Sequence, residues 1–202
     1  MEIKNINKDD IIAVDEIVDI HIATFTGFFL TFMGKGFLRV MYGCYCTHNE
    51  SGLVGAFDDD NLLGFLAYSK NMSGLYKHML KNKFLSFIWY SLLAFLRKPK
   101  IFLRLFRALL KPSESNRNEK YIEISSIGVK PAYKSKGIGT QLIDYIKKTS
   151  DLSKYKYINL ETDAVDNDDV NEFYVKNGFE LSRTYLTAEG RKMNEYRWSN
   201  RE

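Results

Sequence analysis

Three residue types are scarce in this chain of 202 residues, which has two cysteines, three prolines and three histidines. Cys44 and Cys46 are two positions apart, a spacing that on a helix points the thiols to different faces and argues against a disulfide. His21, His48 and His78 are scattered along the chain, so no His/Cys cluster of metal-ligand spacing exists. We therefore expect free thiols in a reducing compartment and no metal.

Acidic residues are missing from residues 71–113, which carry nine lysines and arginines and no aspartate or glutamate. Phe84–Leu96 within this segment is uncharged, but its thirteen residues are fewer than the roughly 20 that span a bilayer. Ile101–Leu110 has a helical pattern with cations on one face and apolar residues on the other, which is typical of an interfacial helix. Residues 71–113 are therefore an insertion that either covers the domain's own core or contacts an anionic membrane or acidic partner through residues 76–111.

The rest of the composition is that of a globular protein. Hydrophobic residues make up 45% of the chain and include 14 Phe and 13 Tyr, which predicts one domain over residues 1–202. The net charge of +4 is mild, and we expect no nucleic-acid partner. Residues 1–10 are polar and charged, unlike a secretory signal. We expect a cytoplasmic monomer or homodimer, peripheral to the inner membrane face if the basic segment binds lipid.

The most informative stretch, Tyr121–Ser150, has the pattern of a strand, a glycine-bearing turn and a helix. Tyr121–Val129 is rich in β-branched and aromatic residues, and Pro131 cannot continue its ladder, so the strand ends there. The amphipathic helix that follows is predicted from a stripe at four-residue spacing: Ile138, Leu142 and Ile146.

The turn between these elements has the chemistry of an anion site. First-turn amides of a helix have no intrahelical partner, and the helix dipole favours negative charge there. Gly137 and Gly139 would let a phosphate approach the backbone, and Lys134 and Lys136 add positive charge. A dinucleotide fingerprint would need a glycine where Leu142 stands, and no Walker motif is present. The residues alone thus leave two interpretations, a phosphate site or a tight strand-to-helix turn.

Two motifs then resemble those of the GNAT superfamily of acyl-CoA-dependent N-acyltransferases. Val129-Lys130-Pro131 and Lys134–Gly139 are similar to its Val-x-Pro and Arg/Gln-x-x-Gly-x-Gly/Ala motif, with Lys134 lacking the fork of arginine. Asn167–Tyr174, followed by Asn177-Gly178-Phe179, is similar to its Asn-x-x-Ala-x-x-Phe-Tyr…Gly-Phe signature. The resemblance is clear over about residues 121–179.

This resemblance implies an α/β (α+β) fold: a mixed, mostly antiparallel central sheet with one parallel strand pair splayed to hold CoA, and helices on both faces. The parallel pair would be Tyr121–Val129 and Tyr155–Thr162, because a right-handed helical crossover joins them. The other expected elements are a strand at Glu2–Ile6, a helix capped by Asp9 or Asp10 with Ile12 on its apolar face, a helix at about Thr31–Tyr45, a hairpin of Leu53–Phe57 and Leu62–Tyr68, a helix capped by Asn167, and a hairpin of Phe179–Leu186 and Arg191–Trp198.

The resemblance also implies acetyl-CoA as the acyl donor. Its pyrophosphate would lie over residues 135–140, and its pantetheine arm would bind the strand backbone like an added strand. The donor-binding residues expected on this basis are Ile127, Val129, Lys134, Ser135, Lys136, Gly137, Ile138, Gly139, Thr140, Asn167 and Phe173.

Two residues match the family's catalytic positions. An amine attacks a thioester only when neutral, so a base must take its proton. Glu123 stands where the histone-type branch has its general base, and Tyr174 matches the tyrosine acid near the thioester sulfur. On the residues alone, Glu123 could instead pair with a neighbouring lysine and Tyr174 could be a core aromatic. Glu161 and His21 are the next candidate bases.

The sequence says least about the identity of the acceptor substrate. By resemblance, the connection between the first two helices forms one wall of its pocket, and an ordinary aromatic core is the alternative. We expect a small-molecule primary amine, with an amino sugar of surface-polysaccharide synthesis as one candidate; peptide or protein N-acetylation and a non-catalytic CoA-binding or membrane-associated role are the alternatives. The pocket candidates are His21, Phe25, Phe28 and Phe29. Five acidic residues near the end of the second parallel strand could attract a cationic amine or belong to a solvated, helix-capping loop: Glu161, Asp163, Asp166, Asp168 and Asp169.

Overall fold

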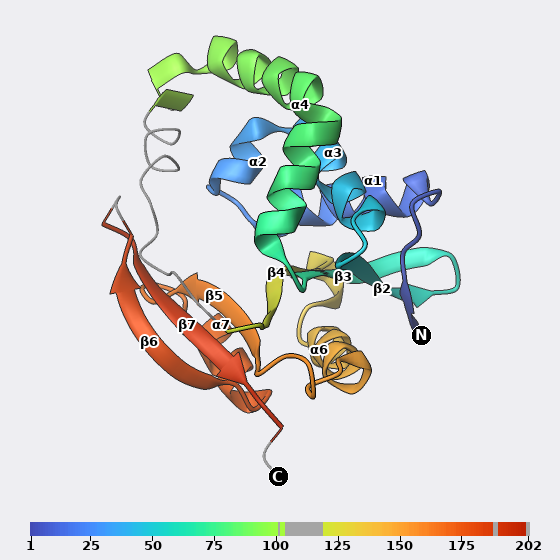
Figure 1. Cartoon of the computed structure of the whole chain (residues 1–202), viewed down its shortest axis with the longest axis vertical. Coiled ribbons are helices and arrows are strands. Elements are labelled where there is room, and N and C mark those ends of the chain that lie inside the picture. The colour runs from blue at the N-terminus through green and yellow to red at the C-terminus, as the bar shows by residue number, and fades with distance from the viewer. Residues whose placement is uncertain (101, 104–118, 188–189, 201–202) are drawn as a thin grey trace.

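The computed structural model describes residues 1–100, 102–103, 119–187 and 190–200. Its frame is a seven-stranded sheet in the order β1-β2-β3-β4-β5-β7-β6 (Figure 1). All neighbouring strands are antiparallel except β4 and β5, which are parallel as expected. The strands are β1 (Glu2–Asn5), β2 (Ser51–Asp58), β3 (Asn61–Ser69), β4 (Ile122–Val129), β5 (Ile158–Asp163), β6 (Glu180–Leu186) and β7 (Lys192–Trp198).

Helices pack on both faces of this sheet (Figure 1). One core lies under α1 and α3 and includes Tyr42 and Phe65, and the other lies under α6 and α7 and includes Leu142 and Phe179. The predicted mixed sheet with helices on both faces is thus confirmed. The helices are α1 (Ile11–Thr24), α2 (Phe29–Met33), α3 (Lys35–Thr47), α4 (Met72–Arg97), α6 (Ile138–Thr149) and α7 (Asp168–Lys176).

Three local predictions need correction. The single helix predicted at about residues 31–45 is two helices, because Gly34, with φ of 90°, ends α2 and begins α3. β5 begins at Ile158 rather than Tyr155, because the chain enters the β4 ladder only there. Ile12 is 77% exposed and does not belong to the buried face of α1. The Asp10 cap is confirmed, since Asp10 Oδ1 accepts a hydrogen bond from the Ala13 amide at 3.0 Å.

The two parallel strands separate part-way along their length. Their register pairs Ile122 with Ile158 and ends at Ile124 with Leu160. β4 nevertheless continues to Val129 along β3, while β5 continues along β7. The backbone on the β5 side of the last part of β4 is therefore outside the parallel ladder, which is the splay that the fold class predicts.

A β-bulge in β4 decides where its two serines point. The register with β3 shifts between Ala67 and Tyr68, so Ser125 is an extra residue in β4. Ser125 Oγ lies 3.7 Å from the sulfur of Met72 on α4, and the Ser126 hydroxyl lies close enough to Tyr42 on α3 to oppose the rise in its pKa. Both serines consequently point toward the α3/α4 side of the sheet.

The predicted insertion begins with one long helix, α4, which bends where Lys83 has non-helical angles of φ −133° and ψ 19° (Figure 1). α4 ends at Arg97, two residues before Pro99, as expected for a residue that disfavours helix before it. The second predicted helix, Ile101–Leu110, lies largely outside the described residues. Within the described residues, no helix is long and apolar enough to cross a membrane.

Candidate functional site

Glu123 lies on β4, one residue before the parallel ladder ends. Its Oε2 accepts a hydrogen bond of 2.8 Å from Nδ2 of Asn159, the residue opposite it on β5. Asn159 is 0% exposed, so its amide is held by the core and fixes the carboxylate at the start of the splay.

Two tyrosines, one on α3 and one on α4, lie near enough to this carboxylate to feel its charge. Burial raises the pKa of the Tyr45 and Tyr76 hydroxyls, and the Glu123 charge raises both further. The charge of Glu161 on β5 also raises the pKa of Tyr76. Glu161 Oε2 in turn accepts a hydrogen bond of 2.6 Å from the Tyr185 hydroxyl. The sheet face toward α3 and α4 therefore holds two carboxylates, Glu123 and Glu161, and several tyrosine hydroxyls near the point where β4 and β5 separate. This is a suitable environment for a cationic amine.

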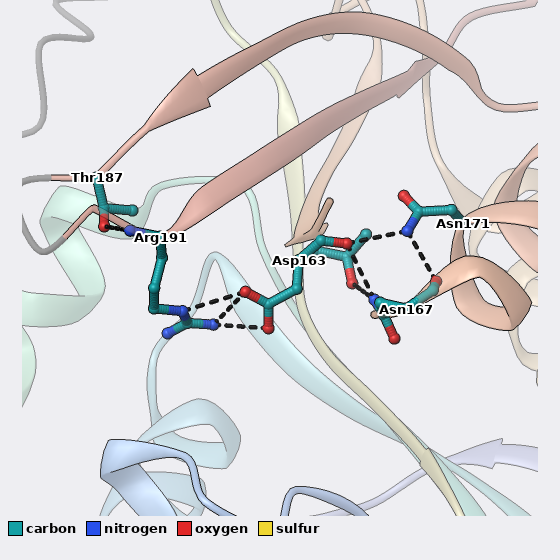
Figure 2. Close-up of polar contacts among 6 residues, drawn as sticks. Asp163, Asn167, Asn171, Thr187 and Arg191 are labelled. Atoms are coloured by element: carbon teal, nitrogen blue, oxygen red, sulfur yellow. Dashed lines mark hydrogen bonds and ion pairs between the residues drawn. The ribbon is translucent and has the colours of Figure 1, made fainter. Parts of the chain in front are cut away.

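The far end of β5 carries an ion pair that reaches the N-terminal part of the chain. Arg191 donates three hydrogen bonds of 2.7 to 3.1 Å to both carboxylate oxygens of Asp163 (Figure 2). The same guanidinium lies 5.2 Å from the ring centroid of Phe28 in the α1–α2 connection. The aromatic connection and the C-terminal hairpin thus meet beside the end of β5.

The four acceptor candidates of the α1–α2 region occupy different depths. Phe28 is 40% exposed, and its ring lies 5.8 Å from that of Phe25, which lies 4.6 Å from His21. Phe29 is half-buried at the first position of α2. His21 is 2% exposed, and its Nδ1 is 2.7 Å from the Tyr42 hydroxyl. It therefore lies in the core, on the buried side of Phe25.

Burial also determines the protonation of His21. Desolvation lowers the pKa of its imidazole to about 4, so the ring is neutral at physiological pH. Its Nε2 is buried and has no hydrogen-bond partner among the described residues.

The turn before α6 has the features expected of an anion site. Gly137 is the N-cap of α6 with φ of 79°, and no side chain caps the helix. A Cβ added at Gly137 would meet no atom within 4 Å, so the space above the first-turn amides is open. Ser135 has φ of 63°, and the exposed Lys136 lies 4.7 Å from the Tyr133 ring centroid. These residues fit a phosphate group, because amides, dipole and ammonium charge converge on open space.

Gly139 joins this turn to α7. A Cβ at Gly139 would lie 2.9 Å from the Phe173 ring, so only glycine allows the ring to pack there. The next residue, Tyr174, is buried against Phe179 and Tyr196. Burial raises the pKa of the Tyr174 hydroxyl, which therefore remains protonated at physiological pH.

Asn167 precedes α7 but does not cap it through its side chain, contrary to expectation. Its Nδ2 instead donates to Thr162 Oγ1 at 2.8 Å and to the Asp163 carbonyl at 3.1 Å (Figure 2). Asn171 donates to the same carbonyl at 2.9 Å and to the Asn167 carbonyl. The motif's asparagines therefore fasten α7 to the end of β5, next to the Asp163–Arg191 pair.

The predicted donor-binding residues thus lie at the end of β4, in the turn before α6 and on α7. The predicted base Glu123 lies beside Asn159 on β5, and the predicted acceptor residue Phe28 lies against Arg191 at the end of β5. Sequence reasoning missed Asn159 and Arg191. A polar residue between the apolar Ile158 and Leu160 was the available signal for Asn159, whereas Arg191 is one of many surface cations. Within the described residues, no three His, Cys, Asp or Glu side chains are grouped as a metal site would require.

Comparison with protein families decides the identity. The model described as the acetyltransferase (GNAT) family matches residues 14–179. The chain belongs to the GNAT family. It is a GNAT N-acetyltransferase that uses acetyl-CoA, and this agrees with the motif residues that prompted the resemblance.

Solved GNAT structures share the fold at low sequence identity. An aminoglycoside 6'-acetyltransferase type Ii superposes with a TM-score of 0.63 at 16% identity, covering 98% of this chain and 97% of the other. An N-acetyltransferase of Staphylococcus aureus Mu50 gives 0.61 at 13%, covering 98% and 100%. NAA60 of Arabidopsis thaliana, in complex with acetyl-CoA, gives 0.56 at 16%, covering 98% and 97%. A comparison with curated proteins gave no match.

Proposed function

We propose that this GNAT enzyme binds acetyl-CoA between the splayed strands and transfers the acetyl group to the primary amine of a small cationic molecule. The observation that carries the proposal is the position of Glu123 at the start of the splay, with the uncapped α6 helix on one side and an acidic, aromatic surface on the other. The whole chain acts as one acetyltransferase domain, with residues 71–113 as an elaboration of it.

The donor contacts follow from the backbone. The first-turn amides of α6, together with Lys134 and Lys136, hold the pyrophosphate, and Gly137 leaves the approach open. The backbone of Ile127 and Val129, outside the parallel ladder, binds the amide-bearing arm as a sheet edge binds an added strand. The bound thioester supplies the acetyl group.

Two side chains carry the proton transfers. Glu123, oriented by Asn159, takes a proton from the acceptor ammonium directly or through water, which makes the amine nucleophilic. The amine nitrogen then forms a bond to the carbonyl carbon and the carbon–sulfur bond breaks. Tyr174 gives its proton to the departing sulfur, a role that suits a hydroxyl kept protonated by burial. The nitrogen loses its second proton to solvent, and the Tyr174 oxygen regains a proton from solvent after it has protonated the sulfur.

The acceptor is recognised by charge and by aromatic surface. Glu161 and Tyr76 lie near Glu123, and the Arg191–Asp163 pair and Phe28 bound the site at the end of β5. Carboxylates beside phenols favour a cationic acceptor, such as a polyamine or an amino sugar. An amino sugar of surface-polysaccharide synthesis remains one candidate within this class.

The test is acetyl-CoA-dependent release of free thiol with three acceptor panels: amino sugars, polyamines and peptide N-termini. The proposal expects turnover with an amino sugar or a polyamine and none with the peptide N-termini. Turnover confined to peptide or protein N-termini would replace it by the alternative of peptide acetylation. Tight acetyl-CoA binding without turnover on any panel would favour a non-catalytic role. We further propose a cytoplasmic location, which suits the free thiols of Cys44 and Cys46.

A further inference from the structure

The second half of α4 has one face on the protein and one face in solvent. Its inner face packs well: Phe87 lies 4.9 Å from Phe37 between ring centroids, Ala94 is fully buried, and Tyr90 fills the space beside Gly36. The outer face carries large apolar side chains three or four positions apart, which places them on one side of the helix. This outer α4 face consists of Leu85, Ile88, Trp89, Leu92 and Leu96, which are 79%, 48%, 58%, 46% and 66% exposed.

Cations lie at both ends of the outer α4 face. Lys81 and Lys83 precede it, and Lys98 and Lys100 follow it. In the described part of the chain, none of these four lysines forms a salt bridge, and residues 71–113 contain no aspartate or glutamate that could neutralise them. An apolar face with unpaired lysines at both ends is the arrangement of a helix that lies in the plane of a membrane interface.

We propose that the outer α4 face binds the surface of an anionic lipid bilayer. The side chains of Trp89 and its apolar neighbours would enter the headgroup boundary while the flanking lysines contact lipid phosphates. The uncharged stretch Phe84–Leu96 is only about 20 Å long as a helix, so it would lie on the bilayer rather than cross it.

A second copy of the chain is a poorer occupant of this face. Pairing two outer α4 faces, in parallel or antiparallel, would bring the lysines at the ends of one helix close to those of the other. Without acidic residues in the segment, that arrangement offers only like-charge contacts at both ends. Anionic headgroups complement the same lysines, so charge favours lipid.

The direct test is co-sedimentation with vesicles of phosphatidylglycerol and phosphatidylcholine, compared with phosphatidylcholine alone. The proposal expects binding to the anionic vesicles at low salt and release as ionic strength rises. Trp89, one of two tryptophans in the chain, should give a blue shift in fluorescence that disappears in Trp89→Phe. Absence of sedimentation at low salt, or equal binding to both vesicle types, would overturn the proposal.

Two pairs of substitutions test the apolar side chains and the flanking lysines of the outer α4 face separately. Leu85→Asp with Leu92→Asp changes exposed side chains, so the fold and acetyl-CoA binding should be retained while sedimentation is lost. Lys81→Glu with Lys98→Glu should also abolish sedimentation, whereas the matched pair Lys8→Glu with Lys148→Glu, exposed elsewhere, should leave it near the parent value.

Oligomeric state completes the test. If the parent forms a concentration-dependent dimer that Leu85→Asp with Leu92→Asp abolishes, and no vesicle binding occurs, the outer α4 face is a subunit interface and the proposal fails. Vesicle binding that survives the aspartate pair would likewise contradict it, because the attachment would then lie elsewhere.

Discussion

Asn159 on β5 donates a 2.8 Å hydrogen bond to Glu123 on β4, across the last rungs of the parallel ladder. Because Asn159 is fully buried, it can hold the carboxylate in one orientation. We predict that Asn159→Leu, which keeps the volume and removes the donor, lowers kcat while leaving acetyl-CoA affinity unchanged. A shifted pH–rate profile should accompany the loss, since a hydrogen bond to a carboxylate favours its ionised form. If the profile keeps its shape, Asn159 is only a packing residue.

The donor site can be tested at Gly137. Gly137→Glu places bulk and negative charge over the α6 amides and should weaken acetyl-CoA binding by at least about tenfold in calorimetry. Gly190→Glu is the matched control, because Gly190 has nearly the same φ, 81° against 79°, and equally open surroundings. Both variants carry the same backbone strain, so equal affinities would show that the donor site lies elsewhere.

A third prediction concerns the contact between Gly139 and Phe173. Gly139→Ala forces the ring to move and should lower the free energy of unfolding by about 1 kcal/mol, together with acetyl-CoA affinity. Combining it with Phe173→Leu should recover part of both losses, because the smaller side chain makes room. Gly43→Ala, in open space on α3, should instead stabilise the protein slightly. Thermal melts of the four proteins decide between these outcomes.

The buried His21 predicts how the stability of the protein depends on pH. Its pKa is about 4 in the folded protein and about 6.5 when unfolded, so the unfolded chain binds the proton first as pH falls. Stability should therefore decrease between about pH 6.5 and pH 4, by at most about 3 kcal/mol from this group. His21→Gln should flatten that part of the curve in denaturant titrations, whatever its effect at pH 7. An unchanged slope would assign the acid sensitivity to other groups.

The sequence predicted those parts of the fold that local patterns encode. The alternation in β4, the stripe of Ile138 and Leu142 in α6, and the glycine after α7 located the strand, turn and helices to within a few residues. The break at Gly34 was missed because its neighbours continue the helical pattern, and only the φ of 90° ends α2 there. The bulge at Ser125 depends on the register with β3, which a single strand does not encode.

The candidate site divides in the same way. The phosphate-binding part of the predicted donor half lies in consecutive residues at one turn, so a motif could identify Gly137 and Gly139. The predicted acceptor half is assembled from separate parts of the chain, and contacts such as Arg191 with Phe28 join residues far apart in sequence. Spacing cannot reveal such contacts, and it cannot reveal that His21 is buried beneath Phe25 rather than facing the acceptor.

The most direct test of the proposed mechanism is the steady-state rate of Glu123→Gln with the best acceptor. Glutamine keeps the shape of the side chain and its contact with Asn159 while removing the basic carboxylate. We predict a loss in kcat of about 10²-fold or more, the usual scale of a positioned base, with acetyl-CoA affinity unchanged. A kcat equal to the parent's across the pH range would contradict the assignment and move the base to another group, such as Glu161.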